Sequence, residues 1–210
     1  MLQVKRTVKG KPVPPEQIAL IVQAITGGLN LQPGDRLLDL CCGNGALTTL
    51  LFAKCAGGLG VDYSAFLIEV AQRLFVHRAS EGFVVADALA YLESEARPQD
   101  CAKVLCYGAF PYFDPAMAQR MLDLLNQRFS QVTTVFLGQL PDKSRMADFF
   151  TTREPAPGEA DNPGSLMGIW RTPEELGDLA RAAGWRAECH RMPADFYAAH
   201  YRYDAILTRL

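Results

Sequence analysis

The sequence predicts an α/β protein, built on a doubly wound, mostly parallel sheet of about seven strands, with helices on both faces and an antiparallel C-terminal strand pair. Two observations predict this fold. Short apolar runs alternate with apolar residues at helical spacing, and the links between them are short, which is typical of parallel strands joined by helices. The 210 residues, 49% hydrophobic and 21% charged, suit one globular domain. We therefore expect residues 1–210 to form a single domain.

The first helix is expected to begin at Glu16, after an extended N-terminal arm over residues 1–15. The arm carries lysines, a glycine and three prolines. Beyond it, apolar residues recur at helical spacing, and Gly27 and Gly28 end the helix. These apolar residues are Ile18, Ile21, Val22, Ile25 and Leu29.

Five strands then alternate with helices. The first strand is a nearly continuous apolar run, which is the pattern of a strand covered on both faces. We expect strands over residues 36–40, 57–62, 82–87, 103–107 and 132–137. We expect helices over residues 46–54 and 66–78, and a third whose apolar residues continue to Phe129. Asp114 is the expected N-cap of that third helix, with Pro115 in its first position.

An insert is expected over residues 138–171. Its central run, residues 153–164, is rich in proline, glycine and acidic residues. A long loop inside a compact domain is usually a lid or a mobile segment, so we expect a lid or a substrate-binding insert, with a solvated surface loop as the alternative. The large apolar residues that flank this run are Phe149, Phe150, Met167 and Trp170.

The C-terminal part of the chain is expected to hold a helix and two strands. Thr172 and Glu175 have the spacing of a capping box, and Gly184 closes the helix. Strands are expected over residues 185–192 and 203–210, joined by an aromatic link over residues 196–203.

Charge and cysteine usage limit the possible partners. The formal net charge is −2, which argues against a nucleic-acid partner, because such proteins usually show a basic surplus. The six cysteines match no zinc ligand set, and no metal site is expected. Buried thiols suit a reducing cytoplasm, and no apolar run has the length of a membrane span, so we expect a cytoplasmic protein without a membrane partner.

Three of the predicted strands end at one sheet edge in residues suited to binding a nucleoside. The first is followed by a glycine turn over residues 41–45, and the next two end in Asp62 and Asp87. Ligands of open α/β sheets bind outside the carboxyl ends of the strands, where an acid after the second strand can bind ribose hydroxyls. Two cofactor classes share this layout, namely dinucleotides and S-adenosylmethionine. The dinucleotide fingerprint fits only if Cys41 replaces its first glycine.

The run LLDLCCGNG over residues 37–45 resembles the first motif of the class I, Rossmann-like S-adenosylmethionine-dependent methyltransferases, with Cys41 in place of the first glycine. The stretches GVDYS, VVADA and KVLCYGAF follow in the order of that family's next motifs. The order of the elements is similar from Glu16 to Leu210. This resemblance implies a Rossmann-like fold, S-adenosylmethionine as cofactor and S-adenosylhomocysteine as product.

The resemblance also implies roles for single residues. Asp39 would hold the amino group of the cofactor, directly or through water, and Cys41 would contact the cofactor through its backbone. Gly43 and Gly45 would pack against the methionine and ribose portion. The remaining implied contacts are Asp62 with the ribose hydroxyls, Tyr63 beside it in the same motif, Asp87 and the Ala88 amide with adenine, and Tyr107 with the sulfonium end. The alternatives are that Asp62 and Asp87 only cap helices and that Tyr107 only packs against its neighbours.

A small molecule is the expected methyl acceptor. The loop over residues 108–114 lacks the polar-Pro-Pro-aromatic order of the amino-methylating DNA enzymes. Oxygen and nitrogen acceptors are both open; oxygen is slightly favoured because His200 could act as a general base, with Tyr107 as a positioning group. Two rival functions are an NAD(P)-dependent oxidoreductase and a cofactor-binding protein without transferase activity.

Overall fold

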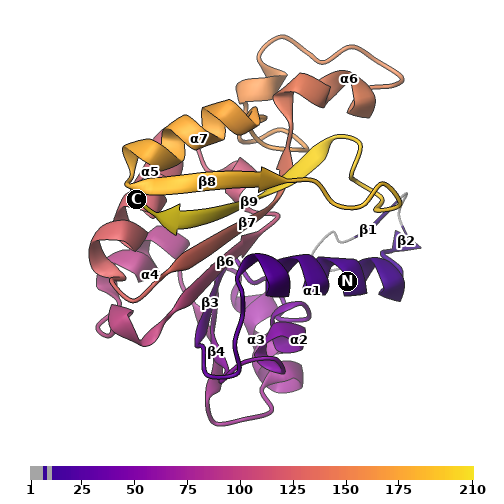
Figure 1. The fold of residues 1–210 in the computed structure, drawn as a ribbon. Coiled ribbons are helices and arrows are strands. Elements are labelled where there is room, and N and C mark those ends of the chain that lie inside the picture. The colour runs from indigo at the N-terminus through magenta and orange to yellow at the C-terminus, as the bar shows by residue number, and fades with distance from the viewer. Residues whose placement is uncertain (1–6, 9–10) are drawn as a thin grey trace.

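A seven-stranded sheet forms the centre of the computed structural model, which describes residues 7–8 and 11–210 (Figure 1). The strand order is β5-β4-β3-β6-β7-β9-β8. The strands are β3 (Leu37–Leu40), β4 (Gly58–Asp62), β5 (Glu81–Val85), β6 (Lys103–Tyr107), β7 (Thr134–Pro141), β8 (Trp185–His190) and β9 (Arg202–Arg209). The first five are parallel, whereas β9 pairs antiparallel with both β7 and β8. The predicted fold class is therefore confirmed.

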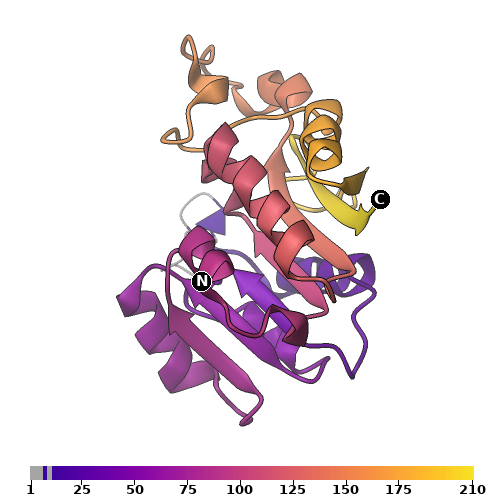
Figure 2. The same cartoon turned by 90° about the vertical axis from the view of Figure 1, so that its left-hand side faces the viewer.

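Helices cover both faces of this sheet and enclose two apolar cores. On one face lie α1 (Pro15–Gly28), α2 (Thr48–Phe52) and α3 (Ala65–Phe75), packed against Leu37, Leu105 and Phe136. On the other lie α4 (Ala88–Ser94), α5 (Pro115–Arg128) and α7 (Pro173–Ala182), packed against Leu38, Val104 and Leu137. Figure 2 faces this second layer, in which α5 crosses in front of the sheet. Among the described residues, no helix is long and apolar enough to cross a membrane.

Helix ends follow the capping residues of the sequence. Asp114 caps α5 by accepting a hydrogen bond from the Met117 amide, and Thr172 and Glu175 form the expected capping box of α7. The helix predicted over residues 66–78 ends earlier, at Phe75, because the backbone of Val76 is extended. The helix predicted over residues 46–54 is shorter in the structure, because α2 has only five residues.

The N-terminal arm and the insert each contain regular structure. Of residues 1–15, residues 1–6 and 9–10 lie outside the described part; the remainder forms two short antiparallel strands, β1 (Thr7–Val8) and β2 (Lys11–Pro12), before α1 begins. The strand predicted to end at residue 137 runs on to Pro141, because Leu140 and Pro141 pair with β9 beyond an irregular register. The rest of the insert holds α6 (Met146–Phe149) and the 3-10 turns η4 (Lys143–Arg145) and η5 (Glu159–Asp161), and it rises above the sheet at the top of Figure 1. Two further 3-10 turns are η2 (Pro98–Asp100) and η3 (Phe110–Tyr112).

A buried carboxylate holds the irregular point of β7. Gln139 has a left-handed backbone, with φ 63°, and its amide donates a 2.8 Å hydrogen bond to Oδ1 of Asp204 on β9. Asp204 is only 4% exposed. Burial raises the pKa of its carboxyl from 3.8 to about 6, although the Gln139 amide and the charge of Arg202 lower it. This raised pKa makes the folded state less stable as the carboxyl ionises.

We expect Asp204→Asn to change the pH dependence of stability. The wild-type carboxyl favours folding below pH 3.8, and this contribution is lost as the pH rises through about 6. The neutral amide keeps an acceptor for the Gln139 amide. The free energy of unfolding of the variant relative to wild type should therefore be up to about 3 kcal/mol higher at pH 8 than at pH 4, at about 1.4 kcal/mol per unit of pKa shift. Urea unfolding at both pH values measures this. Asp178→Asn, on the exposed face of α7, is the matched control, and an Asp204→Asn difference that did not vary with pH would contradict the raised pKa.

Candidate active site

A cavity of about 460 Å³ opens at the carboxyl ends of four neighbouring strands, β3, β4, β5 and β6. This is the edge at which open α/β sheets bind ligands, and the volume suits a ligand of cofactor size. The lining residues from the strand ends are Cys41, Cys42, Gly43, Val61, Asp62, Tyr63, Ala86, Asp87, Ala88, Tyr107, Gly108 and Ala109. Leu67 of α3, Tyr112, Phe113 and Met117 complete the lining.

The turn after β3 needs unusual backbone conformations. Cys41, Gly43 and Gly45 have φ values of 60°, 60° and 73°, all in the left-handed region. At Cys41 a side chain occupies a conformation that glycine adopts without strain. At Gly45 a Cβ atom would lie 2.8 Å from the ring of Phe83 and 3.0 Å from Cβ of Ala71. The turn can therefore lie close to the sheet only with glycine at position 45.

Asp62 connects this turn to the end of β4. Its Oδ2 accepts a 2.9 Å hydrogen bond from the Gly43 amide, and its Oδ1 accepts one of 2.9 Å from the Ser64 amide. The side chain lines the cavity but is only 6% exposed. Because each carboxylate oxygen has two lone pairs, Asp62 can hold the turn and still accept hydrogen bonds from a ligand.

Asp87 is the N-cap of α4. Its Oδ1 accepts hydrogen bonds from the amides of Leu89 and Ala90, at 2.9 and 3.0 Å. No described residue donates a hydrogen bond to its Oδ2, and no described residue accepts one from the Ala88 amide. Capping and ligand contact are therefore compatible at this residue, because Asp87 and Ala88 both line the cavity.

Asp39 and Gly45 lie outside the cavity lining. Asp39 is 3% exposed, and its Oδ2 accepts a 2.5 Å hydrogen bond from the Thr48 hydroxyl, which joins the end of β3 to the start of α2. Tyr63, by contrast, is 78% exposed and lies at the edge of the cavity. The predicted cofactor contacts thus divide into residues that line the cavity and residues that support its turn.

Tyr107 forms a wall of the cavity at the end of β6 and is 9% exposed. Its ring lies directly against Gly138 of β7, where a Cβ atom would be 2.2 Å from Cδ2 of the tyrosine. Only glycine at position 138 leaves room for this ring. Gly138 on β7 therefore makes room for Tyr107 at the end of β6 and fixes the position of its ring.

Two thiols near the turn, those of Cys42 and Cys106, have a raised pKa and carry no charge at neutral pH. Burial is the largest cause that raises the pKa of the Cys42 thiol, followed by the negative charges of Asp39 and Asp62. A hydrogen bond with the Cys41 thiol, together with burial, raises the pKa of the Cys106 thiol. No lysine, arginine or histidine is among the described lining residues, so Asp62 and Asp87 give the cavity a formal charge of −2.

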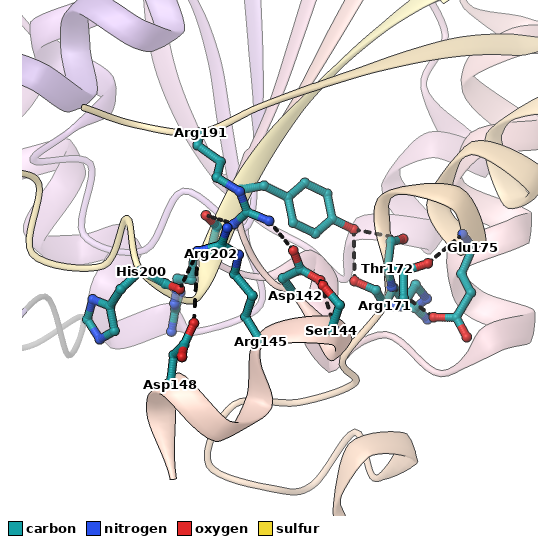
Figure 3. Close-up of polar contacts among 11 residues, drawn as sticks. Asp142, Ser144, Arg145, Asp148, Arg171, Thr172, Glu175, Arg191, His200 and Arg202 are labelled. Atoms are coloured by element: carbon teal, nitrogen blue, oxygen red, sulfur yellow. Dashed lines mark hydrogen bonds and ion pairs between the residues drawn. The ribbon is translucent and has the colours of Figure 1, made fainter. Parts of the chain in front are cut away.

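His200 is not brought to this cavity. It lies in the link before β9, with its ring 4.7 Å from that of Tyr201, and it is not among the lining residues. Its carbonyl accepts a 3.4 Å hydrogen bond from Arg145. In Figure 3 its imidazole points away from the polar contacts around Asp142. The composition of the aromatic link could not show that His200 lies away from the cavity, because its position depends on contacts between residues far apart in the sequence.

Several lining residues were not singled out from the sequence as cofactor contacts. Met117 lines the cavity from the first turn of α5, and Leu67 of α3 and Phe113 line it as well. Their position in the sequence could have indicated this role, because each residue follows closely after a strand end or a helix start at this edge. No group of three or more His, Cys, Asp or Glu residues in the described part is placed to hold a metal ion.

Comparisons with known proteins agree with this geometry. The family model of the methyltransferase domain matches residues 37–130. An uncharacterised methyltransferase of Schizosaccharomyces pombe is 39% identical over 54 residues, which are 26% of this chain and 21% of that protein. The similar segment thus spans about a fifth of the length of this curated relative.

Solved structures share the fold at low sequence identity. Magnesium protoporphyrin IX methyltransferase from Synechocystis PCC 6803, crystallised with S-adenosylhomocysteine, has a TM-score of 0.65 and 17% identity, with 93% of this chain and 83% of that chain covered. A putative methyltransferase in complex with the Trm112 activator from Haloferax volcanii has a TM-score of 0.67 and 16% identity, with 92% and 90% covered. The methyltransferase domain of bacterial CtHen1 has a TM-score of 0.65 and 18% identity, with 92% and 98% covered. The methyltransferase domain model thus matches residues 37–130, and the described chain shares its Rossmann-like fold with these solved methyltransferase structures.

Proposed function

We propose that this chain binds S-adenosylmethionine in the cavity at the ends of β3–β6 and transfers its methyl group to a small-molecule acceptor. The observation that supports this most is the charge of the lining. Asp62 and Asp87 are its charged side chains, and the described lining holds no cation. S-adenosylmethionine has a cationic sulfonium, so the charges are complementary.

The same observation disfavours a dinucleotide. A pyrophosphate is usually bound by glycine-turn amides at the N-terminus of a following helix. Here the Gly43 amide already donates to Asp62, which would place a carboxylate next to the phosphates. The helix after the turn, α2, has only five residues. An NAD(P)-dependent oxidoreductase is therefore the weaker interpretation.

The lining residues fit the parts of the proposed cofactor. Asp62 would accept hydrogen bonds from the ribose hydroxyls, with Tyr63 at the edge of the cavity beside them. Oδ2 of Asp87 would accept one from the adenine amino group, and the Ala88 amide would donate to a ring nitrogen, since neither has another described partner. The turn that contains Cys41 and Gly43 would contact the methionine portion.

Two of the predicted contacts would act from beneath the cavity. Asp39 is joined to Thr48 and would reach the cofactor's amino group through water. Gly45 would let the turn lie on Phe83, which fixes the height of the turn above the sheet. Both residues therefore support the shape of the site.

The chemistry itself needs alignment more than reactive side chains. S-adenosylmethionine supplies, when bound, a methyl group activated by its sulfonium for in-line displacement. Tyr107, held against Gly138, would present a fixed aromatic surface near the positive charge, where cation–π attraction is favourable. Tyr112 and Phe113 would exclude water and orient the acceptor.

We propose that residues 138–171 cover the acceptor. The Tyr112 hydroxyl donates a 2.9 Å hydrogen bond to the Leu166 carbonyl, and the Ile169 amide donates one of 2.7 Å to the Pro111 carbonyl. These bonds join the insert to the loop that lines the cavity. On its other side, Phe149 and Trp170 pack with Tyr201 of the aromatic link, and Phe150 packs on Trp170. This arrangement suits a small acceptor held between cofactor and insert.

An oxygen acceptor is our preference, because three tyrosines, Tyr63, Tyr107 and Tyr112, line the cavity. A role for His200 as the base would require the aromatic link to bring its imidazole to the cavity. His200→Ala should then lower turnover and change the pH–rate profile, whereas His190→Ala, on β8, should not. An unchanged profile in the first variant would remove the base from the mechanism but leave the transfer intact.

Calorimetric titration with S-adenosylhomocysteine tests the cofactor assignment. We expect binding by the wild-type protein and no binding of NADH or NADPH. Asp62→Asn and Asp87→Asn should each weaken binding by about 10- to 100-fold, because each loses a charge-assisted hydrogen bond of about 1.5–3 kcal/mol. Asp178→Asn is the control, since it makes the same chemical change on an exposed helix face. Binding of a nicotinamide but not of S-adenosylhomocysteine would contradict the assignment.

Transfer is tested with methyl-labelled S-adenosylmethionine and three acceptor pools: a metabolite extract, total RNA and total protein. We expect the label in the metabolite pool, and a loss of labelling in Asp62→Asn in proportion to its loss of affinity. Label in RNA or protein would overturn the acceptor class. Binding of S-adenosylhomocysteine without transfer to any pool would instead favour a cofactor-binding protein without transferase activity.

A further inference from the structure

A second cleft, of about 370 Å³, lies between α1 and the antiparallel end of the sheet. It shares no lining residue with the cofactor cavity. Its walls are mostly apolar and come from α1, β7, β8 and β9 and the residues after β8. The residues are Leu20, Gln23, Ala24, Gly27, Gly28, Phe136, His190, Arg191, Met192, Pro193, Asp204 and Ile206.

The carboxylate of Asp204 faces this cleft from β9 and is 4% exposed. Its Oδ1 accepts the hydrogen bond from the Gln139 amide, but no described residue donates one to its Oδ2. Oδ2 is not one of the fully buried side-chain oxygens of the described part, so a ligand in the cleft can reach it. The position therefore suits a ligand that brings a donor, and a positively charged one best of all.

The charged groups around Asp204 do not supply that donor. Arg191 is directed to Asp142 and to the Arg202 carbonyl, as Figure 3 shows for Asp142. Arg202 donates to the carbonyl and the side chain of Gln139. His190 lies directly opposite Asp204 in the strand pair, and its side chain is 56% exposed near Glu188. The residues that α1 contributes to the cleft carry no charge.

Two glycines at the end of α1 give the cleft its shape. At Gly28 a Cβ atom would lie 2.7 Å from the ring of Phe136 and 3.1 Å from Ile206, so this glycine lets the helix contact the sheet. At Gly27 a Cβ atom would meet nothing within 4 Å. The space beside it remains open for a ligand.

We propose that this cleft is a binding site for a small organic amine, with the ammonium group on Asp204 and an apolar body against Leu20, Phe136 and Ile206. The volume is at the lower end of the range for small-molecule sites. The proposal does not depend on the methyl transfer proposed for the other cavity.

Protein-observed NMR titration with 2-phenylethylamine, at pH 7.5, tests the proposal. We expect the amide signals of residues around Asp204 and Gly27 to shift on addition of the amine. The carboxylate 3-phenylpropionate, with the same ring and opposite charge, should bind at least about tenfold more weakly, because its charge is repelled by Asp204.

Three variants identify the site. Asp204→Asn should weaken amine binding by about tenfold or more, as expected for a lost charge-assisted hydrogen bond. Gly27→Leu should fill the cleft and abolish binding. Gly177→Leu, at a glycine of α7 that also has nothing within 4 Å of a Cβ, is the matched control and should bind as wild type. All three should keep the wild-type affinity for S-adenosylhomocysteine, which separates failure of this site from failure of the cofactor cavity.

The pH dependence gives an independent readout. Since the pKa of the Asp204 carboxyl is about 6, amine affinity should rise by about tenfold between pH 5 and pH 7.5 as the carboxyl ionises. This change should vanish in Asp204→Asn.

Undiminished amine binding by Gly27→Leu or Asp204→Asn would overturn the proposal. So would equal binding of the amine and the carboxylate. A wild-type protein that is dimeric by light scattering, and that becomes monomeric in Gly27→Leu, would assign the cleft to a second copy of the chain instead.

Discussion

The hydrogen bond between the Gly43 amide and Oδ2 of Asp62 is the constraint on which the cofactor cavity depends. It joins the turn after β3 to the end of the neighbouring strand, across 19 residues of sequence. Together with the hydrogen bond from the Cys42 amide to the Val61 carbonyl, it fixes the turn against β4. Gly45 completes the constraint from below, because its missing side chain leaves room for the ring of Phe83. The floor of the cavity is therefore set by backbone geometry and one buried carboxylate.

The electrostatics of the cavity follow from that carboxylate. Asp62 is held in place by two amides and Asp87 by two more, so both acids remain at the site without a lysine or arginine partner among the described lining residues. The Cys42 thiol stays neutral, because burial and the neighbouring acids raise its pKa. A cavity with this charge attracts a cation and repels phosphate. A sulfonium cofactor would thus neutralise part of the charge of the two acids, whereas a dinucleotide would place negative phosphates beside them.

The order of the strands along the chain and the residues nearest the turn could be predicted from the sequence, since both depend on local periodicity and spacing. The sequence could not show that Asp39 lies beneath the cavity rather than in its lining, because that depends on a hydrogen bond with Thr48. It could not place His200, whose position is set by packing of Tyr201 against Phe149 and Trp170. Contacts across such distances in sequence have no local signal.

Two adjacent residues at the bulge in β7 each contact a lining residue of one of the two clefts. Gly138 provides the room for Tyr107, which lines the cofactor cavity, and Gln139 is held by Asp204, which lines the amine cleft. A left-handed, buried glutamine is strained and persists only because its amide, carbonyl and side chain are all bonded. Bulges of this kind often redirect side chains next to active sites. This peptide is one connection through which the two sites can be coupled, and the size of that coupling is limited by how differently Asp204 holds Gln139 in its ionised and neutral forms.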